Sequence, residues 1–266
     1  MNLGLDGKVA VVTGGSRGIG KAIARALARE GADLALIARN MQDCEATAAG
    51  IGSETGRTAR AYAADTGDDK AVRLAFQNIV GDFGRLDILV NAAAQPGGQA
   101  SPPSLMEITN ENFWSDVNVK VLGYLRCARE AVPHMLKARW GRIINISGLA
   151  ARSTGTIIGS IRNISVAALT KNLADELGAS GINVTCVHPG VTRTEKTGAL
   201  VQRRAEAAGV RPEEIEQRMA ALNTIRHLVT AEEVADVVVF LASPRSIAIN
   251  GDVIAAGGGA PGAIYY

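Results

Sequence analysis

Short apolar runs alternate with amphipathic stretches along nearly the whole chain. The apolar runs are rich in Val, Ile and Ala, as expected for strands that are buried on both faces of a sheet. They predict strands at residues 9–13, 33–38, 58–64, 86–91, 142–147, 182–187 and 252–255. Between them, apolar positions recur with the helical period, which predicts helices at 18–30, 40–51, 69–83, 111–137, 159–178 and 231–242.

Strands that are separated by helices indicate the fold class. The connections suit parallel pairing with right-handed crossovers, which gives an α/β, Rossmann-type, doubly wound parallel sheet of about seven strands. A chain of 266 residues without a recognisable linker fits one domain, so residues 1–266 are predicted to form a single dinucleotide-binding domain. Two helix starts carry capping-box patterns, with Thr66 and Thr230 as the predicted caps.

One segment departs from this alternation. Residues 195–229 are rich in charge and alanine, and they predict two helices at about 196–208 and 212–221. We expect a helical, lid-like insertion over the substrate cleft. A solvated helical hairpin without a role in binding is the alternative.

The first strand runs into a glycine-rich turn and then into a helix. Such a turn leaves backbone N–H groups free at the positive end of the helix dipole, where they can hold a pyrophosphate. The residues of this turn that we expect to contact a dinucleotide are Gly14, Ser16, Arg17, Gly18, Ile19 and Gly20. A plain tight turn is the alternative, but strand, turn and helix stand in the order that nucleotide binding requires.

Four segments together carry a family resemblance. They read T-G-G-S-R-G-I-G at 13–20, D-I-L-V-N-A-A-A at 87–94, G-R-I-I-N-I-S at 141–147 and H-P-G-V-T-R-T at 188–194. In this order they resemble motifs of the short-chain dehydrogenase/reductase family, over about residues 5–260. The resemblance implies an NAD(P)-dependent oxidoreductase acting on a small alcohol or carbonyl, with further cofactor contacts at Asn91, Pro189, Gly190 and Thr194. It also implies a homo-oligomer, most often a tetramer, that pairs through the helices near 111–137 and 159–178.

The end of the second strand bears on the choice between NAD(H) and NADP(H). An acidic residue there would accept hydrogen bonds from the ribose hydroxyls and repel a 2′-phosphate. This chain has Ile37-Ala38-Arg39-Asn40 instead. Arg39 and Arg17 together favour NADP(H) over NAD(H), and for each of them an exposed arginine without a role is the alternative. Asp65, after the third strand, is either an adenine contact, as the resemblance implies, or a plain helix-start residue.

The resemblance breaks down at the residues that carry the family's chemistry. Family members protonate the substrate oxygen with a Tyr whose pKa is lowered by a Lys four residues later, one helical turn away. The stretch A-L-T-K-N-L-A at 168–174 sets the register and puts Gly159 and Asn163 at these two positions. Glycine has no side chain that could donate the proton, and the asparagine amide carries no charge that could lower the pKa of a neighbour. Residues 125–264 contain no Tyr, so no shift of register restores one.

Other polar residues offer partial substitutes. Ser147 and Asn118 correspond to the family's catalytic Ser and Asn, with a strand-end hydroxyl and a backbone-bonding amide as the alternatives. Arg162 could supply positive charge, but a guanidinium is too weak an acid to deliver a proton. A tyrosine borrowed from the chain end of a neighbouring subunit, Tyr265 or Tyr266, is a further alternative.

Three functions stay open at this point. The first is an NADP(H)-dependent oxidoreductase with impaired or altered catalysis. The second is a catalytically inactive cofactor-binding protein that serves as a sensor or as a subunit. The third is a non-redox reaction on the same scaffold.

Composition and charge restrict the classes of molecule that the protein is expected to bind. A net charge of +2 with scattered arginines argues against nucleic acid as a ligand. No apolar run is long enough to span a membrane, and the first residues lack the core of a signal peptide. Cys44, Cys127 and Cys186 are widely spaced, which predicts buried thiols in a reducing compartment and no metal site. We therefore expect a cytoplasmic protein with a small-molecule substrate and neither a nucleic-acid nor a membrane partner.

Overall fold

The seven predicted strands form one parallel sheet in the order β3-β2-β1-β4-β5-β6-β7. The computed structural model describes residues 2–94 and 102–264. The strands are β1 (Val9–Thr13), β2 (Asp33–Ala38), β3 (Ala59–Ala63), β4 (Ile88–Asn91), β5 (Gly141–Ile146), β6 (Ile182–Pro189) and β7 (Val253–Ala256). The strand order reverses between β1 and β4, and open α/β sheets bind their ligands beyond the carboxyl ends of the strands at such a point.

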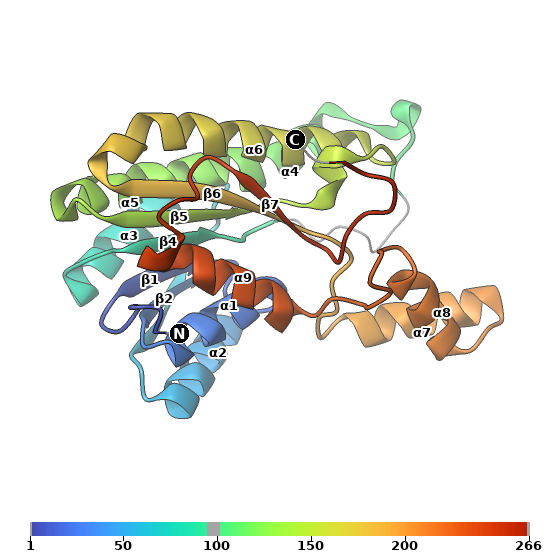
Figure 1. The fold of residues 1–266 in the computed structure, drawn as a ribbon, viewed down its shortest axis with the longest axis horizontal. Helices are drawn as coiled ribbons and strands as arrows, with labels where there is room; N and C mark the ends of the chain where they lie inside the picture. Colours follow the sequence, from blue (N-terminus) through green and yellow to red (C-terminus); the bar gives the residue numbers. More distant parts are fainter. Residues whose placement is uncertain (1, 95–101, 265–266) are drawn as a thin grey trace.

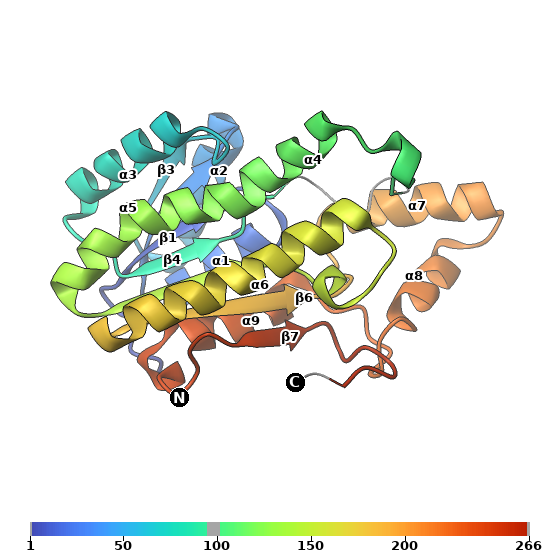
Figure 2. The same ribbon diagram turned by 90° about the horizontal axis from the view of Figure 1, so that it is seen from above.

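Helices cover both faces of the sheet (Figure 1). One face carries α1 (Gly18–Arg29), α2 (Met41–Thr55) and α9 (Ala231–Ala242). The opposite face carries α3 (Asp69–Phe83), α5 (Gly123–Ala138) and α6 (Ile157–Leu177), and Figure 2 shows α5 and α6 running along the strands. No helix within the described ranges is long and apolar enough to cross a membrane.

Alternate residues of the central strands pack into opposite cores. Val12, Val90 and Ile144 belong to the core beneath α1 and α9. Their neighbours Val11 and Leu89 pack with α3 and α5 on the other face. Because both faces are covered, these strands need apolar residues at every position, which accounts for the continuous apolar runs in the sequence.

The two predicted capping boxes have different outcomes. The box at Thr230 is confirmed: its hydroxyl accepts from the Glu233 N–H, and the Glu233 carboxylate accepts from the Thr230 N–H. The prediction for Thr66 is wrong, because the Asp68 side chain caps α3 by accepting from the N–H groups of Lys70 and Ala71. The Thr66 hydroxyl instead donates to the carbonyl of residue 119 and ties this loop to the neighbouring helix.

The predicted helix at 111–137 is interrupted near its middle. It consists of α4 (Asn110–Val117), a π-helical segment at Asn118–Leu122 and then α5. A π-helical turn accommodates an additional residue, so side chains after it point in other directions than in a regular α-helix. Such turns occur frequently at functional sites, and Lys120 lies buried within this one.

The two helices predicted for the insertion are present as α7 (Thr197–Ala208) and α8 (Pro212–Ala220). Figure 1 shows this hairpin extending away from the sheet. It has a small apolar core of its own, made of Val201, Ala205, Ile215, Met219 and Leu228. The hairpin is therefore a packed unit beside the carboxyl ends of the strands.

Candidate functional site

A cavity of about 840 Å³ opens beyond the carboxyl ends of the central strands. This volume lies within the usual range for small-molecule and cofactor sites. Most of the residues predicted to contact a cofactor or substrate line it, namely Gly14, Ser16, Arg17, Gly18, Ile19, Gly20, Arg39, Asp65, Ser147, Asn163, Pro189, Gly190 and Thr194. The sequence motifs thus converge on one site, although they are spread over most of the chain.

The glycine turn depends on its glycines for its shape. Gly14 and Gly18 have φ angles of 67° and 54°, in the left-handed region that other residues rarely adopt. A Cβ atom on Gly20 would collide with the Gly14 carbonyl. The absence of these side chains allows the turn to fold tightly against the start of α1, whose first residues line the cavity.

The N–H of Gly18 already has an anionic partner. Both carboxylate oxygens of Glu195, which comes just before α7, lie 3.1 Å from the Gly18 nitrogen. A carboxylate is favoured at the positive end of a helix dipole for the same reason as a phosphate. The turn therefore has the chemistry that a pyrophosphate requires, and Glu195 competes for one of its donors.

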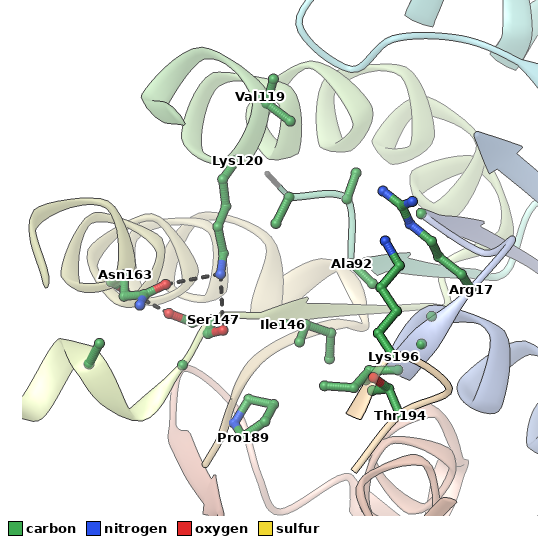
Figure 3. A pocket seen from close by; sticks show the side chains of 18 of the residues that line it. Arg17, Ala92, Val119, Lys120, Ile146, Ser147, Asn163, Pro189, Thr194 and Lys196 are labelled. Carbon is green, nitrogen blue, oxygen red and sulfur yellow. Dashed lines mark hydrogen bonds between the residues drawn. The ribbon is translucent and has the colours of Figure 1, made fainter. Parts of the chain in front are cut away.

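Positive charge gathers around the glycine turn. Arg17 and Lys196 extend into the same part of the cavity (Figure 3), and Arg39 lines it from the end of β2. No acidic residue lies between Ile37 and Asn40. This part of the cavity therefore offers positive charge and no carboxylate at the end of β2. Asp65 also lines the cavity, and its carboxylate accepts from the Gly67 N–H at 2.8 Å.

Three of the predicted site residues, Asn91, Asn118 and Gly159, do not line the cavity. Asn91 is fully buried between strands, where its amide donates to the Asn145 side-chain oxygen at 2.9 Å. Asn118 accepts from the Arg126 guanidinium at 2.8 Å and donates to the Gly67 carbonyl at 3.0 Å. The π-helical segment begins at Asn118, and this residue binds the loop that leads into α3. In this structure both amides hold elements of the fold together.

Gly159 is likewise absent from the cavity lining. It lies in the first turn of α6, where its N–H donates to the hydroxyl of the capping residue Thr156 at 3.2 Å. A Cβ on Gly159 would lie 2.6 Å from the Thr156 methyl carbon. A larger residue at this position would therefore have to displace the helix cap.

A lysine from the π-helical segment reaches Asn163, one of the two residues predicted to stand at the family's catalytic positions. The Lys120 ammonium donates to the Asn163 side-chain oxygen at 2.9 Å and to the Ser147 carbonyl at 3.0 Å (Figure 3). The Ser147 hydroxyl in turn donates to the Asn163 carbonyl at 2.9 Å. The three residues come from the π-helical segment, the end of β5 and α6, and all three line the cavity.

Burial controls the protonation of Lys120. The side chain is almost completely enclosed, and this desolvation lowers the pKa of Lys120 from its ordinary value to about 7. The nearby Arg162 guanidinium lowers it further, while Cys186 and Asp116 act in the opposite direction. At neutral pH, the ammonium and the free amine are therefore both populated.

Lys120 was not singled out from the sequence. The only signal was one lysine inside the apolar stretch V-N-V-K-V-L at residues 117–122. In a regular helix, such a residue is usually explained as a lysine that reaches out to solvent. The π-helical turn that directs it into the protein has no reliable signature in a single sequence.

Arg162 and His188, which also lie near Lys120, are paired and neutral respectively. Arg162, which lines the cavity, forms an ion pair with Asp116 between α6 and α4. His188 is buried on β6, and desolvation lowers its pKa to about 4, so it is neutral at physiological pH. The described residues contain no group of three or more His, Cys, Asp or Glu side chains that could hold a metal ion, and Cys44, Cys127 and Cys186 are buried free thiols.

Comparison with known proteins adds independent information. Residues 14–260 match a family model described as enoyl-(acyl carrier protein) reductase. The chain is 35% identical over 254 residues to the short-chain reductase protein NovJ of Streptomyces niveus. The aligned region spans 95% of this chain and 94% of NovJ.

Solved structures agree with this relationship. L-sorbose reductase from Gluconobacter frateurii, crystallised with NADPH and L-sorbose, superposes with a TM-score of 0.93 at 29% identity, covering 99% of this chain and 100% of the other. A xylitol dehydrogenase bound to NAD+ superposes with a TM-score of 0.86 at 27% identity, covering 96% and 100%. The resemblance seen in the sequence motifs is thereby confirmed. The chain belongs to the short-chain dehydrogenase/reductase family.

Proposed function

We propose that this protein binds NADP(H) and acts as an oxidoreductase on a small alcohol or carbonyl, with catalysis altered by the loss of the family's Tyr and Lys. The observation that carries the proposal is the cavity, into which the glycine turn and three cationic side chains converge. The L-sorbose reductase structure, which holds NADPH, supports this choice. The xylitol dehydrogenase with NAD+ shows that the same fold accepts either dinucleotide, so the preference rests on this chain's own residues.

The preference for NADP(H) depends chiefly on Arg39. A charge-assisted contact to a 2′-phosphate contributes about 1.5–3 kcal/mol, which corresponds to a preference of roughly tenfold to a hundredfold over NAD(H). We expect Arg39→Asp to remove this preference, as measured by nucleotide fluorescence titration with NADPH and NADH. Arg211→Asp makes the same charge change at an exposed position outside the cavity lining and should leave both affinities unchanged. Equal affinities in the parent protein would contradict the assignment.

The residues around the cavity define what the protein can contribute to the reaction. Bound NADP(H) would supply or accept the hydride. We expect Ser147 to bind the substrate oxygen after its hydroxyl leaves the Asn163 carbonyl. Gly159 has no proton to give. Steady-state turnover with a panel of small ketones, aldehydes and alcohols tests the proposal, and we expect slow but measurable NADPH oxidation.

A second candidate function follows from the same substitutions. Without a Tyr at position 159 and a Lys at position 163, the chain could serve as a catalytically inactive cofactor-binding protein, a sensor or a subunit of a larger assembly, or it could run a non-redox reaction. Tight NADPH binding with no oxidation across the whole panel would favour the inactive protein. Binding of carboxylates or acyl thioesters without NADPH oxidation would favour the non-redox reaction.

The α7–α8 hairpin fits the role of a lid over the substrate. Met219, Leu222 and Asn223, at and just after the end of α8, line the cavity and give it a partly apolar wall. The hairpin therefore belongs to the binding site as well as to the surface. This placement supports the lid over a hairpin without a role.

We also propose a homotetramer with two-fold axes. Trp114 on α4 and Ile161 and Ile164 on α6 are apolar side chains with exposed fractions of 59%, 41% and 56%. They lie on the two neighbouring helices that the family resemblance assigns to self-association, and a two-fold interface would cover them. Light scattering at micromolar concentration should give a mass about four times that of the chain, and a strict monomer would contradict the proposal.

A further inference from the structure

Lys120 is a buried cation without a counter-ion. Its residue is 4% exposed, and both of its recorded partners, the Ser147 carbonyl and the Asn163 amide oxygen, are uncharged. Within the described residues, no carboxylate lies within ion-pair distance of its ammonium, and the nearby Asp116 is paired with Arg162. A lysine is almost never fully buried unless it is paired, because the loss of hydration destabilises the charged form.

The position of Lys120 suggests why this arrangement exists. It lies in the π-helical segment and faces the cavity, next to the positions that the family uses for proton transfer. Its two hydrogen bonds fix the direction of the side chain and leave the third N–H of the ammonium for a ligand. Gly148 adds no side chain to this wall: a Cβ there would lie 3.2 Å from the Asn163 amide nitrogen. Because Lys120 lines the cavity, an oxygen atom of a bound molecule can approach it from that side.

The two hydroxyl donors nearest to the Lys120 hydrogen-bond network are engaged. The Tyr124 hydroxyl donates to the Ile146 carbonyl at 2.8 Å, and this tyrosine is buried outside the cavity lining. The Ser147 hydroxyl is bonded to the Asn163 carbonyl. Arg162 faces the cavity, but a guanidinium does not release its proton near neutral pH.

We propose that Lys120 is the proton donor to the substrate oxygen, which rests on the proposed reductase function. Hydride addition to the carbonyl carbon moves the carbon–oxygen π pair onto the oxygen. The Lys120 N–H bond then breaks, its electron pair stays on nitrogen, and the proton forms the new O–H bond. The neutral amine regains a proton from water, and in the alcohol-oxidising direction the same amine accepts the proton.

The surroundings of Lys120 suit both halves of this cycle. Arg162 on α6 and Asp116 on α4 bring opposite charges to the region, while Cys186 and His188 approach from β6 as neutral groups. With a pKa of about 7, the lysine can both give and take a proton at neutral pH, which is the condition for efficient general acid–base catalysis. An ammonium of ordinary pKa would be a much weaker acid.

The test compares three variants of the full chain with the wild type. Lys120→Met removes the proton and the charge, whereas Lys120→Arg keeps the charge but cannot release a proton. Lys171→Met is the matched control, because Lys171 is exposed on α6 and paired with Asp175, away from the cavity. For each protein, NADPH affinity is measured by fluorescence and kcat by NADPH oxidation with the carbonyl panel between pH 5.5 and 9.

We expect both Lys120 variants to lose kcat by about 10²–10⁴-fold, the range for loss of a general acid, while NADPH affinity stays within threefold. The inflection near pH 7 in the pH profile of the wild-type kcat should be absent from the profiles of both Lys120 variants. A role in positioning alone would be rescued by the Arg variant. A second readout needs no turnover: in protein labelled with ¹³C at the lysine ε-carbon, one signal should titrate near neutral pH and be missing from the Lys120→Arg spectrum.

The possible outcomes distinguish a failure of the proposed role of Lys120 from a failure of the proposed reductase function. If the wild type turns over and either Lys120 variant keeps more than a third of its kcat, Lys120 is not the donor, and the reductase function stands. A ¹³C titration of Lys120 near its ordinary pKa of 10.5 also overturns the role of Lys120 alone. A wild type that binds NADPH but reduces no carbonyl overturns both proposals, and a failure to bind NADPH overturns the proposed function itself.

Discussion

Removing the Lys120 charge should change the pH dependence of folding stability. In the folded protein, the pKa of Lys120 falls from 10.5 to about 7 because the ammonium is desolvated. Below about pH 7 the residue is protonated in both states, so the folded state bears the full cost of burying the charge. Between pH 7 and 10.5 only the unfolded chain keeps the proton, and stability therefore rises with pH. Lys120→Met should abolish this rise.

The size of the effect follows from the lowered pKa. At about 1.4 kcal/mol for each pH unit, the change corresponds to a total of about 5 kcal/mol in the free energy of unfolding, and ~3 kcal/mol of this is gained between pH 6 and pH 9. Methionine has a similar length and no charge. It leaves the Ser147 and Asn163 oxygens without this donor, but that cost does not depend on pH.

Urea unfolding at fixed protein concentration, followed by circular dichroism at several pH values, measures this difference. The difference in the free energy of unfolding between wild type and Lys120→Met should shift in favour of the wild type by ~3 kcal/mol from pH 6 to pH 9. Lys171→Met should follow the wild type throughout. If the curves of wild type and Lys120→Met stay parallel within about 0.5 kcal/mol, the lysine is not held as a buried cation and the reasoning fails.

Two further predictions concern neighbouring residues. Glu195→Gln removes a negative charge from the Gly18 N–H, so NADPH affinity should rise. The expected increase is about two- to fivefold in fluorescence titrations, which is the range for an exposed charge near a helix end. Weaker binding would mean that Glu195 shapes the turn for the cofactor. Asn163→Lys brings a second ammonium to Lys120 and removes one of its acceptors, which should lower the free energy of unfolding at pH 7 by about 2 kcal/mol or more. Adding Lys120→Asn should restore most of that loss in a double-mutant cycle, whereas strictly additive effects would show that the two residues do not interact.

The fold followed closely from the sequence because its main determinants are local and repeated. Runs such as V-A-V-V at 9–12 are apolar at every position, as strands covered on both faces require. The glycine turn contains residues with positive φ angles, which favour glycine. The family motifs then fixed the order of the elements. These signals depend on a few residues that are close together in the chain.

The chemistry of the site was less accessible because it depends on directions of side chains from distant segments. Asn118 and Lys120 are two residues apart, yet the π-helical turn binds the first to a loop and directs the second into the cavity. The carboxylate of Glu195 meets Gly18 across 177 positions of sequence. The predicted borrowing of Tyr265 or Tyr266 lies outside the described residues and stays a prediction.

The contact between Glu195 and Gly18 links the proposed lid to the proposed cofactor site. Glu195 belongs to the short connection between β6 and α7, so one carboxylate joins the root of the lid to the first turn of α1. A bound pyrophosphate, as proposed above, would compete with this carboxylate for the Gly18 N–H. Occupancy of the glycine turn and the position of the α7–α8 hairpin would then depend on each other, so that each would change the binding equilibrium of the other.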